Sequence, residues 1–143
     1  MSNQYFQTIH QIITTGHWIT HRMGQELKEF GITEPQYNVL RTLKEERGKP
    51  ISVQEIQQKM VQRSSNVTRI IDKLLLKGCV GRHECPSNRR KMDITLTKTG
   101  EDLLRRLDTK VVKFHSPLQQ RLTEEELETL QDLIKKLTAD KND

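Results

Sequence analysis

The forty residues from Val61 to Gly100 constrain the fold of this chain more than any other segment. Residues 64–77 space apolar and polar side chains as a helix that buries one face does. Either Ser64 or Ser65 can cap the start of that helix, and Gly78 suits the left-handed position after its end. The predicted inward residues are Val67, Ile70, Ile71 and Leu74.

A strand, a polar turn and a second strand follow this helix. Residues 79–84 and 92–96 are predicted strands, and in the second of them apolar and polar residues alternate, so that one face is buried. Residues 85–91 are too polar and turn-rich to pack, and we expect them to project as a wing. Thr97 is the predicted cap of the next helix. This order is the second half of a winged helix-turn-helix, an element whose common use is to place a helix in the DNA major groove.

Positive charge is concentrated in the same segment. Residues 60–100 hold nine Lys/Arg and three Asp/Glu, a net charge of +6, whereas residues 1–59 carry +1 and residues 101–143 carry −2. The whole chain has a formal net charge of +5 and a pI of about 9.3. Basic charge gathered on one element favours a polyanion as the partner.

Two capping boxes predict helix starts before the basic segment, at residues 33–36 and 52–55. Pro35 suits the first turn of the earlier helix. Ile51 is expected to form a one-residue bridge to the later hairpin. The predicted inward residues of these two helices are Tyr37, Leu40, Leu43, Ile56 and Met60.

Long amphipathic helices are predicted at both ends of the chain. Residues 3–30 form one helix, in which Gly16 and Gly24 are the weak points. A helix from Thr97 onward is interrupted near its end by Pro117, and a capping box at residues 123–126 starts the last helix. Their apolar faces exceed what one small lobe can cover, so we predict that they pack on each other and on a second copy. The predicted dimer-interface residues are Phe6, Ile9, Ile13, Leu118, Leu127, Leu130, Ile134 and Leu137.

A length of 143 residues fits a single domain. We predict a mainly α fold of six helices with a small β-hairpin wing, in which dimerisation helices at residues 1–32 and 101–143 flank a DNA-binding lobe at residues 33–100. No apolar run approaches the roughly 20 residues that span a bilayer, and the N-terminus lacks a signal peptide's features. Cys79 and Cys85 form no metal knuckle. We therefore expect a cytoplasmic protein without cofactors or a membrane partner.

Four motifs resemble those of the MarR family of bacterial winged helix-turn-helix transcriptional regulators. They are residues 67–74 in the fourth helix, Lys77-Gly78 with Arg82, residues 86–90 in the wing, and residues 96–100 at the start of the fifth helix. The resemblance extends over nearly the whole chain. It implies a homodimer that binds a pseudo-palindromic operator, often as a repressor. It also implies release from DNA by small molecules, oxidants or metals, as for many members.

The outer face of the fourth helix and the wing form the predicted DNA-binding surface. Short polar side chains and arginine near a helix N-terminus can reach base edges or phosphates, and a guanidinium on a narrow hairpin can enter the minor groove. The alternative for the two serines is helix capping, and the alternative for the basic wing residues is a solvated turn that does not contact DNA. Asn88 stands where the family usually has an aspartate that supports the wing arginine. The predicted DNA-binding residues are Ser64, Ser65, Asn66, Thr68, Arg69, Lys73, Arg89, Arg90 and Lys91.

An effector pocket, a redox sensor and a metal site each have candidate residues. Trp18, His21 and Tyr37 are candidates for lining a small-molecule pocket, with core packing as the alternative. Cys85 lies among wing arginines, which favour the reactive thiolate, whereas Cys79 is expected to be a small buried hydrophobe. His17 and His21 are spaced to share a helix face, but no third ligand lies near them in sequence, so we predict no metal site.

Two other classes of function compete with DNA binding. A winged-helix module that binds protein instead of DNA would carry an apolar patch on the outward face of the fourth helix. An enzyme is disfavoured, because the sequence has no phosphate-binding glycine loop, nucleophile elbow or paired-carboxylate constellation. The sequence thus predicts a homodimeric, sequence-specific DNA-binding regulator that acts as a repressor and responds to a small-molecule effector.

Overall fold

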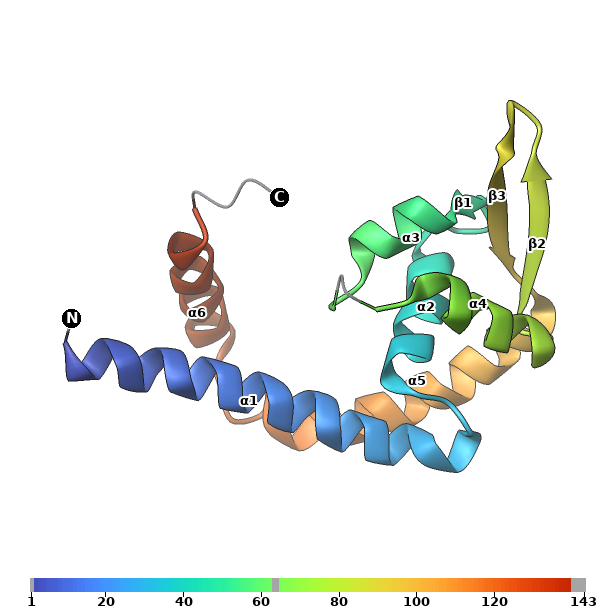
Figure 1. Cartoon of the computed structure of the whole chain (residues 1–143). Helices are drawn as coiled ribbons and strands as arrows, with labels where there is room; N and C mark the ends of the chain where they lie inside the picture. The colour runs from blue at the N-terminus through green and yellow to red at the C-terminus, as the bar shows by residue number, and fades with distance from the viewer. Residues whose placement is uncertain (1, 63–64, 140–143) are drawn as a thin grey trace. The chain divides into compact units, whose positions relative to one another are not determined.

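The computed structural model describes residues 2–62 and 65–139, with the backbone alone at Arg89. Within these residues it contains six α-helices and a three-stranded antiparallel sheet (Figure 1), which confirms the predicted fold class. Internal contacts group residues 1–111 into one compact unit and residues 112–143 into another. None of the described helices is both long enough and apolar enough to cross a membrane.

The first unit holds most of the secondary structure. In chain order its elements are α1 (Asn3–Leu27), the 3-10 turn η1 (Lys28–Phe30), α2 (Glu34–Glu45), β1 (Ile51–Ser52), α3 (Val53–Lys59), α4 (Val67–Leu76), β2 (Val80–Cys85), β3 (Asn88–Leu96) and the first part of α5 (Lys98–Gln119). The second unit holds the end of α5 and α6 (Glu124–Leu137).

Side-chain caps start the helices largely where the sequence predicts. Thr33 and Thr123 each form a full capping box with the residue three positions later. The Ser52 hydroxyl accepts a hydrogen bond from the Glu55 backbone N–H at 3.2 Å. Each of these bonds satisfies a backbone donor that the first turn of a helix leaves unpaired.

The long helices tolerate their weak points. α1 runs unbroken through Gly16 and Gly24 and ends at Leu27, after which Gly31 adopts a left-handed conformation with φ of 68°. The predicted interruption of the next long helix at Pro117 is wrong, because α5 continues to Gln119. Proline removes one hydrogen bond to the preceding turn, which a helix can lose near its end without unwinding.

The predicted cap of α4 is also wrong. Asn66 is the N-cap, and its side-chain oxygen accepts from the Arg69 backbone N–H at 3.1 Å. The helix therefore begins at Val67, which is buried, so the first turn is fixed by packing and the cap falls on the residue before it. Ser65 precedes the cap, and Ser64 lies outside the described residues.

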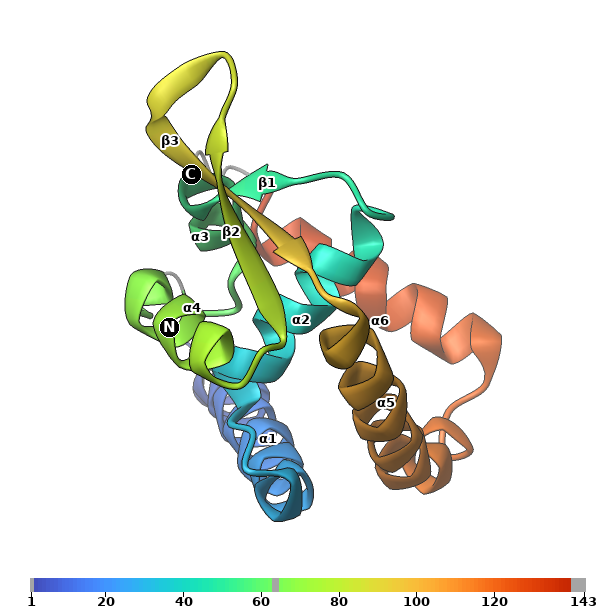
Figure 2. The same ribbon diagram turned by 90° about the vertical axis from the view of Figure 1, so that its right-hand side faces the viewer.

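The sheet has the strand order β1-β3-β2, and the hairpin of β2 and β3 projects beyond the helices as a wing (Figures 1 and 2). The predicted bridge at Ile51 is confirmed by its pairing with Ile94. The predicted loop at residues 85–91 is too long, since only residues 86 and 87 separate the strands. Polar residues can form strands where both faces meet water, so polarity alone does not mark a loop.

The hydrophobic core joins α2, α3, α4, the sheet and the first half of α5. Predicted inward residues of three helices, including Leu40, Ile56 and Ile71, are fully buried. Gly100 brings the start of α5 directly against the end of the Lys77–Cys79 turn, because a Cβ there would overlap the carbonyl oxygen of Cys79 and lie 2.8 Å from the Leu96 side chain. The hydroxyl of Thr97 accepts from the Gly100 backbone N–H at 3.1 Å, which confirms its predicted capping role.

Candidate nucleic-acid interface

α4 has one buried and one exposed face, as the sequence predicts. Val67, Ile71 and Leu74 are buried against the core. The exposed side chains of the other face are Asn66, Thr68, Arg69, Asp72, Lys73 and Leu76. Leu76 is 90% exposed and, seven residues after Arg69, lies on the same helix face. The outward face is therefore polar and basic with one apolar side chain.

An ion pair ties this helix to the wing. Arg82 of β2 donates to Asp72 of α4, with a nitrogen–oxygen distance of 2.5 Å. Both side chains are partly exposed, so the pair adds little stability by itself. It does place a cation beside the carboxylate of the outward face, which would otherwise repel a phosphate backbone. Arg82 belongs to one of the family-like motifs, but its partner could not be predicted, because Asp72 lies ten residues away and no local pattern links the two.

The wing carries its basic residues on a bulge. The strand register steps from Glu84 opposite Met92 to Cys85 opposite Asn88, so residues 89–91 fall between paired positions. Arg90 and Lys91 are exposed, and the side chain of Arg89 is not described. A bulge bends the strand and re-aims its side chains.

Asn88 supports this bulge without adding charge. Its side-chain oxygen accepts from the Arg90 backbone N–H at 3.0 Å. An asparagine therefore supplies the acceptor that a turn of this kind needs, as aspartate does. The wing tip keeps its local hydrogen bond and gains no negative charge next to its arginines.

The loop before α4 is tied to α3. The side-chain amide of Gln57 donates to the carbonyl oxygen of Ser65 at 3.0 Å, and Ser65 is half-buried. Ser65 therefore lies just before the N-cap Asn66 and not on the first turn of α4, where the sequence had placed it. Gln57 was not among the predicted site residues, because its role depends on a contact eight residues away that no local pattern marks.

The terminal helices expose apolar side chains in each unit. Of the predicted dimer-interface residues, Phe6 and Ile13 on α1 and Leu130, Ile134 and Leu137 on α6 are exposed. Ile9, Leu118 and Leu127 are half-exposed. Further apolar residues outside the predicted set are also exposed, namely Tyr5, Ile12, Val112, Leu122 and Leu133.

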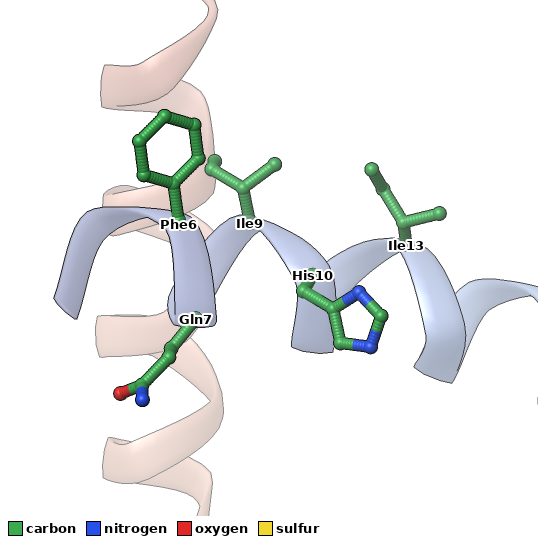
Figure 3. Close-up of a pocket in the computed structure, with 5 residues that line it drawn as sticks. All are labelled: Phe6, Gln7, Ile9, His10 and Ile13. Atoms are coloured by element: carbon green, nitrogen blue, oxygen red, sulfur yellow. The ribbon is translucent and has the colours of Figure 1, made fainter. Parts of the chain in front are cut away.

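An open hollow runs along the outer half of α1 (Figure 3). It is lined by Phe6, Gln7, Ile9, His10 and Ile13, and the three apolar side chains point to one side of the helix while Gln7 and His10 point to the other. All five come from one helix, so the hollow is an exposed apolar face and not an enclosed ligand cavity.

The effector candidates lie in different environments. Trp18 and His21 are exposed on α1, whereas Tyr37 is buried in α2 and its hydroxyl donates to Asp108 at 2.7 Å. Burial is the main cause that raises the pKa of Tyr37 well above its usual value, and the bond to Asp108 adds to it. The Tyr37 hydroxyl therefore stays protonated and acts as a donor.

The two cysteines also lie in different environments. Cys79 is buried, as expected, and burial raises the pKa of its thiol. Cys85 is partly exposed at the outer end of β2, with its Sγ 3.2 Å from the hydroxyl of Ser87. Across the described part of the chain, no group of three or more His, Cys, Asp or Glu side chains could hold a metal ion.

The sequence matches a family model and a known relative, and both belong to transcriptional regulators. The model of the MarR family matches residues 32–92. The HTH-type transcriptional regulator PrsX of Escherichia coli is 33% identical over 126 residues, which cover 85% of this chain and 76% of PrsX.

Solved structures show the same fold. AbsC, a MarR family transcriptional regulator from Streptomyces coelicolor, superimposes with a TM-score of 0.85 at 21% identity and covers 97% of this chain and 95% of AbsC. A mutant of MarR from E. coli complexed with operator DNA superimposes with a TM-score of 0.79 at 25% identity, covering 94% of this chain and 96% of that one.

Proposed function

Because the chain belongs to the MarR family of transcriptional regulators, we propose that it binds a specific pseudo-palindromic operator as a homodimer and represses the adjacent genes. α4 enters the major groove, and the wing reaches the minor groove beside it. The observation that carries this proposal is the division of α4 into a buried apolar face and an exposed polar face, next to a basic wing. The complex of MarR from E. coli with operator DNA supports the same partner here.

The exposed apolar side chains of α1 and α6 support the homodimer. A stripe of apolar side chains exposed to water along a helix is unfavourable and marks an interaction site. A second copy of the chain presents the same apolar surface, so a two-fold axis can cover both copies at once. Two copies of α4 then face half-sites one DNA turn apart, about 34 Å.

We also propose that a small-molecule effector regulates DNA binding. It would release the dimer from DNA by changing the distance between the two copies of α4, so that they no longer match one turn of DNA. The exposed Trp18 and His21 of α1 are the candidate contacts, since an aromatic ring and an imidazole can together bind a small aromatic or acidic molecule.

Selection of bound duplexes from a random DNA pool at near-physiological salt tests DNA recognition directly. An enriched inverted repeat is expected, since a two-fold dimer binds two related half-sites. Recovery of no consensus, or of salt-sensitive binding without symmetry, would contradict specific dimeric binding. It would favour the alternative of a protein-interaction module, for which Leu76 on the outward face of α4 is the supporting observation.

Arg69→Ala and Arg90→Ala are each expected to weaken binding to the selected duplex by about 1–3 kcal/mol. Arg69→Ala removes a contact to a base edge or a phosphate, and Arg90→Ala removes a guanidinium from the minor groove. Affinity is measured by fluorescence anisotropy, and far-UV circular dichroism should stay unchanged because both side chains are exposed.

Arg121→Ala is the matched control, since it removes the same charge from an exposed position in the second unit. It should leave the affinity close to that of the wild type. Wild-type affinity in both the Arg69 and the Arg90 variants would rule out the proposed contacts.

A further inference from the structure

Asp108 of α5 holds two residues of α2 at once. Its Oδ1 accepts from the Tyr37 hydroxyl at 2.7 Å, and its Oδ2 accepts from the Arg41 guanidinium at 3.2 Å. Tyr37 and Arg41 are one helical turn apart, so they face the same side of α2. Both oxygens of one carboxylate are therefore engaged with a single helix.

This contact differs from an ordinary surface ion pair. Tyr37 is only 7% exposed, so loss of the bond to Asp108 would leave the hydroxyl of a buried residue without this acceptor. The partner carboxylate is one-third exposed and also pairs with the Arg41 guanidinium. A buried donor bound to a charged acceptor fixes a geometry more strictly than two solvated charges do.

The same turn of α5 also forms ion pairs with the end of α1 and with η1. Lys110 lies 2.8 Å from a carboxylate oxygen of Glu29 and 3.7 Å from one of Glu26. Leu104 and Leu107, just before this turn, are fully buried in the core, and the compact first unit ends at residue 111. Residues 107–111 are thus where α5 is fastened to α2 and to the end of α1 before it continues into the second unit.

α2 is the support of the DNA-binding elements. It packs against α3, α4 and β3, so α4 and the wing follow its orientation (Figure 2). The second unit supplies five of the eight proposed dimer-interface residues, and α5 is one continuous helix from Lys98 to Gln119. The contact at Asp108 therefore fixes the orientation of α2, and with it α4 and the wing, relative to the first part of α5.

We infer that Asp108 is a positioning residue for DNA binding, which holds Tyr37 and Arg41 so that the two copies of α4 in a dimer keep one fixed separation. The inference rests on the proposed function, because it needs a dimer that binds two half-sites. Asp108 does not touch DNA. It narrows the range of half-site spacings that the dimer accepts.

Asp108→Asn and Tyr37→Phe test this role, with Glu101→Gln as the matched control. Glu101 is also on α5 and pairs with Lys44 of α2, at 3.8 Å between exposed side chains. Asp108→Asn and Glu101→Gln make the same change of charge, which alone would strengthen DNA binding slightly in both. The probes are the duplex selected by the wild type, versions with the half-sites moved by one base pair in either direction, and a random duplex.

For Asp108→Asn and Tyr37→Phe we expect operator affinity to fall roughly threefold to thirtyfold, the span measured for residues that couple sites. Affinity for the random duplex should not fall, and preference among the three spacings should flatten. The double variant should lose no more than the stronger single variant, because both changes break one contact. Urea unfolding confirms that each variant is folded in the assay.

The outcomes separate the inference from the proposed function. A wild type that selects no symmetric duplex overturns the proposed function itself. A wild type with one preferred spacing, shared by the Asp108 and Tyr37 variants, overturns the positioning role alone. A Glu101→Gln variant that flattens the preference among spacings as strongly as Asp108→Asn also overturns the positioning role. Any ion pair between α2 and α5 would then have the same effect on spacing.

Discussion

The double substitution Leu130→Glu and Ile134→Glu is expected to separate the dimer into monomers. It should also lower operator affinity by at least about a thousandfold, which is the lower end of the usual difference between specific and non-specific binding. The two side chains lie four residues apart on the apolar face of α6 and are 45% and 43% exposed. Their replacement therefore leaves the core of the first unit untouched. Burying two carboxylates against a second apolar face without partners costs far more than such an interface supplies.

Light scattering at micromolar concentration should give the mass of one chain for this variant and of two for the wild type. Thr129→Glu with Gln131→Glu is the control, because it adds the same charges to the same helix at exposed polar positions. A double variant at 130 and 134 that remains dimeric would show that α6 does not form the interface. A monomeric wild type would refute the dimer altogether.

Gly100→Ala is expected to destabilise the protein by about 3 kcal/mol, at the upper end of the cost of overpacking. The added Cβ would overlap the Cys79 carbonyl oxygen and lie 3.0 Å from the Cys79 carbonyl carbon, so backbone atoms would have to move. The same turn is held by the Thr97 hydroxyl, which donates to the Gly78 carbonyl oxygen at 2.6 Å. The start of α5 therefore cannot move away from this turn without breaking the bond between Thr97 and Gly78.

Urea unfolding at fixed protein concentration measures this loss. Gly24→Ala is the internal comparison, since a Cβ at Gly24 in α1 meets nothing within 4 Å. It should stabilise the protein by roughly 0.5–1 kcal/mol through helix propensity. Equal stabilities for the two variants would mean that the contact at Gly100 relaxes at no cost.

Local signals predicted the helices well, because each signal acts within a few residues. Thr33 and Thr123 start helices through bonds to the residue three positions on, and Gly78, with φ of 72°, ends α4 as expected. The apolar faces of α2, α3 and α4 are buried as their periodicity predicts. Where local signals compete, as at Ser64, Ser65 and Asn66, packing of Val67 decided among them.

Contacts between distant residues were beyond such signals. Tyr37 and Asp108 are 71 positions apart, and neither residue type nor spacing marks them as partners. Helical spacing places Asp72 on the outward face of α4, but nothing in the sequence marks Arg82 as its partner. The positions that face DNA in the proposal could be predicted, since they follow from helix and hairpin geometry. The side chains that hold α4 and the wing in place could not be predicted.

The short first strand has a thermodynamic consequence for the wing. β1 pairs with β3 only at Ile94 and Asp93, so the outer ribbon from Glu84 to Met92 has two strands and no third neighbour. A two-stranded ribbon is marginally stable by itself in water. Its amide hydrogens should exchange rapidly in the free protein and slowly in the complex. Part of the binding enthalpy then offsets the entropy of ordering the ribbon, so a disulfide across its strands should tighten DNA binding through a slower dissociation rate.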